Sequence, residues 1–325
     1  MPRAFLIDTD TASDDAVALI MALRAPDVDV RAITIVAGNV PVAQAARNAL
    51  YVAELCGSAA PVYPGANQPL LREYMHAEWF HGKDGLGDHN YPAPRRAPEP
   101  VHAVEAIIET VRANPGLTLV TLGPLTNVAL AVARAPEIVS NVARTVVMGG
   151  APCCEGNVTP AAEYNIWVDP EAARIVFRAG LPIEMVGWHL CRGTAALSPA
   201  DIGHVLAFGT PLARFAIECN STAMEAYRIQ TGEVGISLPD PVAMSIALDP
   251  AICTSANDHY VDVEASSDLT RGMTVVDRLG IAANDRNRAI WKPLLDRGRK
   301  TRVCWTIDVP RWKQVLYAAL CQHAA

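Results

Sequence analysis

The first half of the chain alternates short apolar runs with segments whose apolar residues recur at helical spacing. Ala4–Ile7 and Ala32–Val36 are short and apolar, as buried strands are. Ser13–Leu23 lies between them and repeats apolar residues three and four positions apart, which predicts a helix. Further strands are predicted at Leu117–Leu122, Val142–Met148 and Leu181–Val186, and further helices at Val42–Cys56, His102–Arg112, Leu125–Arg134 and Pro170–Arg178.

This alternation predicts the fold class. Repeated strand–helix units build a parallel sheet with helices on both faces, so we expect an α/β fold with a mostly parallel, Rossmann-like open sheet. Residues 198–230 are helical in pattern, and we expect residues 196–240 to form an additional helical lobe near the active site. The whole of residues 1–325 is expected to be one domain. A late helix is predicted at Asp240–Leu248, late strands at Tyr260–Glu264 and Val303–Ile307, and a terminal helix at Pro310–Gln322.

Composition and charge narrow the class of protein. The 325 residues are 51% apolar, which is enough to bury a large core and excludes a disordered chain. With 27 basic and 34 acidic side chains the net charge is −7, which argues against a nucleic-acid partner. No segment has the roughly 18 consecutive apolar residues that span a bilayer, so no membrane partner is expected. Eight scattered cysteines and no segment typical of a signal peptide lead us to expect a cytoplasmic protein with reduced thiols.

Four aspartates follow the first predicted strand within eight residues, namely Asp8, Asp10, Asp14 and Asp15. In open α/β sheets, ligands bind beyond the carboxyl ends of the strands. The N-terminus of the next helix stabilises a negative charge by about 0.3–1 kcal/mol, which cannot offset repulsion among four carboxylates. A bound cation can, and oxygen ligands favour Ca²⁺ or Mg²⁺ over zinc. The alternative is that Ser13 caps the helix and the aspartates only decorate its first turn.

Two known families carry aspartates in this position. Haloacid-dehalogenase-type phosphatases place an aspartate pair after a buried strand, as Asp8 and Asp10 are placed here. The full spacing Asp8-x-Asp10-x-x-x-Asp14-Asp15 instead resembles the ribonucleoside hydrolase signature, although Ala12 stands where that family has glycine. Further blocks match the same family in order, namely Val36–Asn39, Phe80–Gly87, Leu122–Asn127, Met148–Gly150, Glu155–Asn157, Ala162–Ile166 and Asp240-Pro241. The resemblance to the inosine-uridine preferring nucleoside hydrolase family therefore covers nearly the whole chain.

The resemblance implies calcium-dependent hydrolysis of the N-glycosidic bond of ribonucleosides, which yields ribose and a free base. It assigns Asp10, Asp15, Asp240 and the backbone carbonyl of Leu122 as ligands of Ca²⁺, an ion that takes about 6–8 oxygens. Asp10 would also be the general base for a metal-bound water, and the transition state would resemble an oxocarbenium ion. Carboxylates and amides are implied to hold the ribose hydroxyls, namely Asp14, Asn39, Asn157, Glu163 and Asn165.

The chain departs from the family pattern where the base leaves. Pro239 stands directly before Asp240, where relatives carry a histidine or an aromatic residue, so assistance to the leaving base must come from elsewhere. His81 is the nearest candidate for a catalytic role at the base, and Trp79 offers a stacking face. Further base-contacting candidates on the helical segment before Asp240 are Tyr227, Arg228 and Gln230. The preference for purine or pyrimidine stays open.

The chain admits three functions. The first is the calcium-dependent hydrolase with a small-molecule nucleoside as its partner, and because relatives are commonly dimers or tetramers we expect a homodimer or homotetramer. The second is a non-catalytic ribose- or nucleoside-binding protein that keeps the metal site, which Pro239 and Ala12 leave open. The third is a dehalogenase-type phosphatase with a covalent aspartyl-phosphate at Asp8, against which the later sequence blocks argue.

Overall fold

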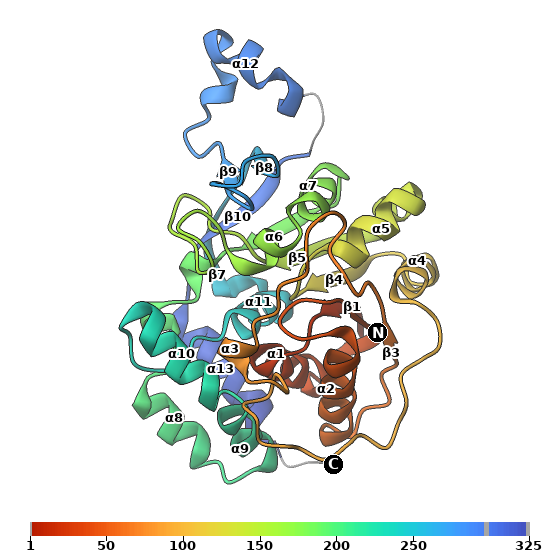
Figure 1. Ribbon diagram of the computed structural model, residues 1–325, viewed down its shortest axis with the longest axis vertical. Coiled ribbons are helices and arrows are strands. Elements are labelled where there is room, and N and C mark those ends of the chain that lie inside the picture. The colour runs from red at the N-terminus through yellow and green to blue at the C-terminus, as the bar shows by residue number, and fades with distance from the viewer. Residues whose placement is uncertain (1, 296–298, 323–325) are drawn as a thin grey trace.

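Eight strands form one central sheet in the computed structural model, which describes residues 2–295 and 299–322 (Figure 1). The strand order is β3-β2-β1-β4-β5-β6-β10-β7, and the edge strand β7 alone runs antiparallel to its neighbour among these described strands. The predicted mostly parallel α/β sheet is thereby confirmed. The strands are β1 (Arg3–Thr9), β2 (Val28–Ile35), β3 (Val62–Pro64), β4 (Leu117–Thr121), β5 (Val142–Met148), β6 (Ile183–Val186), β7 (Cys253–His259) and β10 (Thr301–Ile307).

Helices cover both faces of this sheet. Alternate side chains of β1 point to opposite faces, so that Phe5 and Ile7 pack into one hydrophobic cluster and Leu6 packs into another. The first cluster includes side chains of α1 (Ser13–Arg24), α2 (Val42–Leu55), α11 (Pro239–Leu248) and α13 (Val309–Leu320). The second includes side chains of α4 (Ala103–Ala113), α5 (Thr126–Arg134), α6 (Tyr164–Val168) and α7 (Pro170–Arg178). Within residues 2–295 and 299–322, every helix is too short or too polar to cross a membrane.

The helical region predicted at residues 198–230 is divided into three helices by cap signals inside it. Ser198 and Thr210 each accept a hydrogen bond from a backbone N–H in the turn that follows, and a proline occupies the first helical position after each. The short helix α3 (Glu78–His81) packs against this region, so a loop from the first half of the chain reaches it (Figure 1). The three helices are α8 (Pro199–Leu206), α9 (Pro211–Glu218) and α10 (Ser221–Thr231).

The late strands agree with the prediction only in part. The strand predicted at Val303–Ile307 is confirmed as β10. The strand predicted at Tyr260–Glu264 is present as β8 (Val261–Val263), but it pairs with β9 (Thr274–Val276) in a separate two-stranded sheet. Beyond this small sheet, α12 (Asp285–Leu295) projects from the body of the molecule (Figure 1). The edge of the main sheet is β7, which the sequence did not predict because its residues are mostly polar or small and form no apolar run.

The buried Asp169 joins three segments near the carboxyl ends of the strands. Its Oδ2 accepts hydrogen bonds from the Thr126 hydroxyl at 2.7 Å and from the backbone N–H of Leu70 at 2.8 Å. Its Oδ1 accepts a hydrogen bond from the backbone N–H of Ala172 at 3.0 Å, which caps α7. One carboxylate therefore fixes the starts of two helices and the loop that follows β3.

Asp169→Ala is expected to lower the free energy of unfolding by about 2–4 kcal/mol, because it removes three hydrogen bonds and leaves buried donors unpaired. Urea denaturation followed by circular dichroism measures the change. The control Glu137→Ala removes an exposed ion pair with Arg112 and should leave the urea midpoint essentially unchanged. A midpoint for Asp169→Ala no lower than that of the control would show that these hydrogen bonds do not hold the loops.

Candidate functional site

The polar loops of the chain meet where the strand order reverses. From β1 the chain runs outward to β2 and β3, and later returns to add β4, β5 and β6 on the other side of β1. A switch of this kind leaves a crevice beyond the carboxyl ends of the strands. Four adjacent strands each lead to a predicted site residue here, since Asn39 follows β2, Asp10 follows β1, Leu122 follows β4 and Glu163 follows β5.

A cavity of about 380 Å³ lies at this crevice. Asp240 lines the cavity, and burial followed by the charges of neighbouring carboxylates, Asp15 and Asp10 among them, raises its pKa. Asp10 and Asp15 are fully buried and lie outside the lining. The structure thus brings together residues that lie up to 230 positions apart, namely from Asp10 to Asp240. The predicted site residues that line the cavity are Asp14, Asn39, Trp79, His81, Leu122, Asn157, Glu163, Asn165 and Asp240.

Three carboxylates converge at the cavity, because Asp14, Asp15 and Asp240 each offer an oxygen within 4.8 Å of the others. Asp14 and Asp15 lie in the first turn of α1, Asp240 lies in the first turn of α11, and the two helices pack against each other. Two helix N-termini therefore favour negative charge at one point. Asp15 is held in place by the backbone N–H of Ala12 at 2.9 Å and by the hydroxyl of Thr9 at 2.5 Å, both of which donate to it.

Asp10 has one oxygen held and one open. Its Oδ2 accepts a hydrogen bond from the backbone N–H of Asn39 at 2.5 Å. Its Oδ1 is buried and has no hydrogen-bond partner among the residues that the structure describes. Two glycines leave room for this carboxylate, since a Cβ on Gly38 would lie 2.0 Å from Oδ2 and a Cβ on Gly123 would lie 2.6 Å from Oδ1. The chain therefore seats the carboxylate tightly but leaves Oδ1 to be satisfied by something else.

The electrostatics of the cluster favour a bound cation. Burial raises the pKa of Asp14 and Asp15 to about 6, and burial together with the charge of Asp15 raises the pKa of Asp10 and Asp240 well above the usual range. Neither lysine nor arginine is among the described residues that line the cavity. A divalent cation fits this set of oxygen donors, because it would compensate charges that the protein leaves uncompensated.

The predicted sugar-binding residues are fixed by contacts with the backbone. Glu163 accepts hydrogen bonds from the backbone N–H groups of Gly150 and Asn165, both at 2.8 Å, and burial raises its pKa to about 7. Asn157 Oδ1 accepts a hydrogen bond from the backbone N–H of Tyr164 at 2.9 Å. Asn165 Nδ2 donates to the carbonyl of Leu122 at 2.7 Å, and a carbonyl oxygen keeps a second lone pair for a cation.

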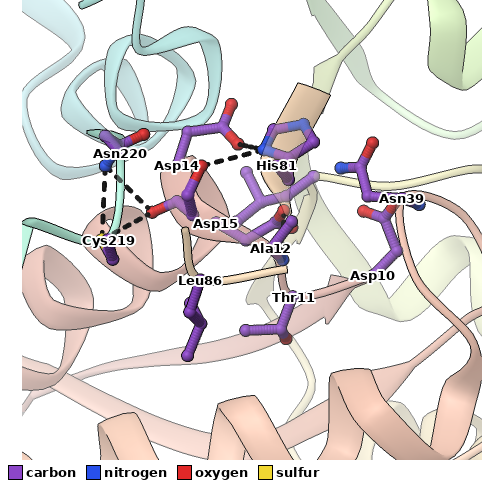
Figure 2. Close-up of polar contacts among 12 residues, drawn as sticks. Asp10, Thr11, Ala12, Asp14, Asp15, Asn39, His81, Leu86, Cys219 and Asn220 are labelled. Atoms are coloured by element: carbon purple, nitrogen blue, oxygen red, sulfur yellow. Dashed lines mark hydrogen bonds and ion pairs between the residues drawn. The ribbon is translucent and has the colours of Figure 1, made fainter. Parts of the chain in front are cut away.

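His81 lines the cavity beside Asp14 (Figure 2), and it forms a buried pair with Ser13. Ser13 Oγ lies 2.8 Å from His81 Nδ1, and Asp14 Oδ1 lies 3.8 Å from the same nitrogen. The interpretation in which Ser13 caps α1 is therefore wrong, because the N-cap position is Ala12 and the Ser13 hydroxyl bonds the imidazole. Burial lowers the pKa of His81 to about 4, so this side chain is neutral at pH 7.

The candidates on α10 lie differently from the prediction. Tyr227 is fully buried, and its hydroxyl donates to Glu233. Arg228 is exposed and pairs with Glu225 at 2.6 Å. Neither side chain lines the cavity, so the structure does not bring these two predicted residues to the site. Gln230, one turn further along α10, does line it.

Asp8 lies outside the cavity lining. Its Oδ2 accepts hydrogen bonds from the Thr34 hydroxyl at 2.6 Å and from Asn127 Nδ2 at 2.9 Å. Burial raises its pKa to about 7. The carboxylate that a dehalogenase-type phosphatase would use as its nucleophile is thus engaged between β2 and α5.

Large apolar and aromatic side chains supply much of the remaining cavity wall, and no role at the site was predicted for them from the sequence. Phe80, Met148 and Tyr164 lie inside sequence blocks that match the family, and two of them adjoin residues that were assigned a role, as Phe80 adjoins His81 and Tyr164 adjoins Glu163. That adjacency is the signal that could have found them. The residues are Met75, Phe80, Met148, Tyr164, Trp167 and Trp188.

The chain is similar to nucleoside hydrolases in sequence. The family model of the inosine-uridine preferring nucleoside hydrolase matches residues 5–314. The pyrimidine-specific ribonucleoside hydrolase RihA of Shewanella sp. (strain MR-7) is 41% identical over 293 residues, which cover 89% of this chain and 91% of the relative. RihA of Salmonella enteritidis PT4 is 40% identical over 294 residues, which cover 89% of this chain and 93% of the relative.

Solved structures show the same similarity. A plant nucleoside hydrolase, PpNRh1, superposes with a TM-score of 0.89 at 31% identity and covers 98% of this chain and 99% of its own. A purine-preferring ribonucleoside hydrolase from Gardnerella vaginalis superposes with a TM-score of 0.87 at 30% identity and covers 98% of both chains.

Gly38→Ala is expected to weaken metal binding at least about 10-fold, because the new Cβ would lie 2.0 Å from Asp10 Oδ2 and must displace that carboxylate. Isothermal titration calorimetry with CaCl₂ on chelator-treated protein measures the affinity. Gly203→Ala in α8 is the matched control, since a Cβ there meets no atom within 4 Å. Equal affinities for the two variants would show that Asp10 takes no part in holding the ion.

Proposed function

Since the chain belongs to the inosine-uridine preferring nucleoside hydrolase family, we propose that its cavity binds a ribonucleoside and hydrolyses the N-glycosidic bond. The enzyme class is N-glycosidase, and the products are ribose and a free base. The observation that carries the proposal is the cluster of Asp14, Asp15 and Asp240 at a cavity large enough for a small ligand. The phosphatase alternative is wrong, because the match to the nucleoside hydrolase family spans residues 5–314.

The metal that we propose is Ca²⁺. Its ligands would be Asp10, Asp15, Asp240 and the carbonyl of Leu122, and Asp14 is close enough to contribute an oxygen. All are hard oxygen donors, and Ca²⁺ accepts about 6–8 of them, which leaves room for water and two sugar hydroxyls. When bound, the ion lowers the pKa of a coordinated water and orients the ribose.

Asp10 is the proposed general base. Its Oδ2 is occupied by the N–H of Asn39, so Oδ1 is the atom that takes the proton from the attacking water. Burial raises its pKa, and a bound cation would hold the carboxylate in the ionised form that a general base needs. Glycines at positions 38 and 123 let this carboxylate sit close to the backbone without steric conflict.

Amides and carboxylates along the cavity are proposed to hold the ribose hydroxyls. Glu163, Asn157 and Asn165 are already fixed by hydrogen bonds with the backbone, so little of their side-chain entropy is lost when the sugar binds. Interactions that strengthen as positive charge develops on the sugar would stabilise an oxocarbenium-like transition state. The proposed residues are Asp14, Asn39, Asn157, Glu163 and Asn165.

The base side of the proposal relies on His81 and Trp79. The tautomer that we propose has Ser13 donating to Nδ1, so that the neutral imidazole carries its N–H on Nε2 and can donate it to the leaving base. Trp79 is 64% exposed and offers a stacking face. Tyr227 and Arg228 are not carried into the proposal, because they do not line the cavity.

Relatives named pyrimidine-specific share 40–41% identity with this chain, so we propose a pyrimidine ribonucleoside as substrate.

Assembly and compartment remain predictions. We propose a homodimer or homotetramer that works in the cytoplasm. All eight cysteines are free thiols, which suits a reducing compartment.

Removal of the metal with EGTA is expected to lower the rate of base release from uridine at least about 100-fold, and added CaCl₂ should restore it. Asp240→Asn should reduce the rate similarly and raise the CaCl₂ concentration needed for half-maximal activity. Asp249→Asn, at the other end of α11, is the matched control and should behave as the wild type. Thermal stabilisation by uridine without any base release would support the non-catalytic alternative instead.

His81→Ala is expected to lower kcat/KM for uridine by about 10²–10⁴-fold, because the leaving base loses its hydrogen-bond donor. The rate on p-nitrophenyl riboside, whose leaving group needs no such donor, should fall much less. Since the pKa of His81 is lowered to about 4, the imidazole is neutral at pH 5 and above. The pH profile of the wild-type rate should therefore show no step near pH 6.5, where a free histidine titrates. Equal losses on both substrates would contradict the assigned role.

A further inference from the structure

Asn220 is a buried amide at the cavity with one atom left open. Its side chain is fully buried, and the residue lines the cavity. Nδ2 donates to the carbonyl of Ala216 at 2.9 Å and to the carbonyl of Ser13 at 3.3 Å. Oδ1 has no hydrogen-bond partner among the residues that the structure describes. Buried amide oxygens are nearly always paired, so this atom indicates a ligand or a bound water.

The orientation of the amide is fixed by its surroundings. If the amide were rotated by 180°, Oδ1 would face the carbonyl oxygens of Ala216 and Ser13, and two acceptors would be opposed. Nδ2 therefore points into the protein and Oδ1 is the atom left for the cavity. The site presents a preorganised acceptor at this position.

Ser13 connects this acceptor to His81. Its hydroxyl lies 2.8 Å from His81 Nδ1 while its carbonyl accepts from Asn220 Nδ2, so one residue of α1 orients both side chains. Asp14, the next residue, is the proposed sugar ligand. Asn220 thus lines the cavity together with the proposed sugar ligand Asp14 and the proposed base contact His81, and Ser13 links it to both.

We propose that Asn220 Oδ1 accepts the N3–H of a uracil-type base and so determines specificity in the reaction proposed above, on which this inference rests. Uracil carries a hydrogen on N3, whereas N3 of cytosine carries a lone pair that would oppose Oδ1. A site built to bond an N–H rejects analogues that lack it, because its own buried polar atom is then left unpaired. The enzyme should therefore prefer uridine to cytidine.

The test compares kcat/KM for wild type and Asn220→Ala on uridine, cytidine, 3-methyluridine and p-nitrophenyl riboside. Wild type should favour uridine over cytidine and over 3-methyluridine by at least about 10-fold. In the variant, uridine should lose about 10- to 100-fold, and both preferences should fall toward equality. The rate on p-nitrophenyl riboside, which has no N–H to offer, should stay within about 3-fold of wild type.

Cys219→Ala is the matched control, because Cys219 also contacts the Ser13 carbonyl, at 3.6 Å, but does not line the cavity. It should change all four substrates by the same factor. An equal loss on all substrates in Asn220→Ala as well would overturn the inference and show a structural role. Failure of wild type to hydrolyse any riboside, p-nitrophenyl riboside included, would instead refute the proposed function.

The wild-type protein supplies a second measurement that needs no variant. The substrate 5-methyluridine adds the same methyl bulk as 3-methyluridine but keeps the N3–H. Wild type should hydrolyse 5-methyluridine at least about 10-fold more efficiently than 3-methyluridine. Equal efficiencies would overturn the inference even if Asn220→Ala does not fold.

Discussion

The structure depends on the burial of like charges at one point. Asp10, Asp14, Asp15 and Asp240 are all at least nine-tenths buried, and burial raises the pKa of each. Neighbouring aspartates raise the pKa of Asp10, Asp15 and Asp240 further. A protein that only had to be stable would place apolar residues there, since uncompensated buried carboxylates are costly. Their presence is therefore explained by what they bind, and a hard divalent cation is the ligand that their oxygen chemistry suits.

The fold brings the carboxylates of this cluster together and partly stabilises their negative charge. Parallel strands β2, β1, β4 and β5 lie side by side, so the loops at their carboxyl ends are neighbours although they are far apart in the sequence. The N-termini of α1 and α11 add partial positive charge at the same place. Gly38 and Gly123 allow the Asp10 carboxylate to approach the backbone more closely than any side chain would permit. Rigid elements thus hold the polar atoms before any ligand arrives.

Much of the fold and site could be predicted from the sequence, because strand–helix alternation and polar residues at strand ends follow directly from burial. Asp10, Asn39, Leu122 and Glu163 were predicted on that basis together with the family resemblance, and the structure places each at the switch point of the sheet. The strand β7 could not be predicted, since an edge strand with mostly polar and small residues carries no apolar pattern.

The side chains that face the base could not be predicted from the sequence, for a different reason. A helical pattern does not say which way each residue of α10 faces. Of the three candidates named on this helix, Tyr227, Arg228 and Gln230, only Gln230 is among the described residues that line the cavity. Asn220 was not predicted, because its proposed role depends on an Oδ1 atom without a hydrogen-bond partner. Which amide atom is left unpaired depends on the contacts of Nδ2 with other segments, and the sequence does not contain that information. Contacts between distant segments decide such roles, and only coordinates reveal them.

Anomalous diffraction from crystals of the protein grown with CaCl₂ tests the central claim most directly. The account predicts one strong peak per chain, about 2.3–2.6 Å from oxygens of Asp10, Asp15 and Asp240 and from the carbonyl oxygen of Leu122. No peak among these carboxylates at millimolar calcium, or a peak held by other residues, would contradict it.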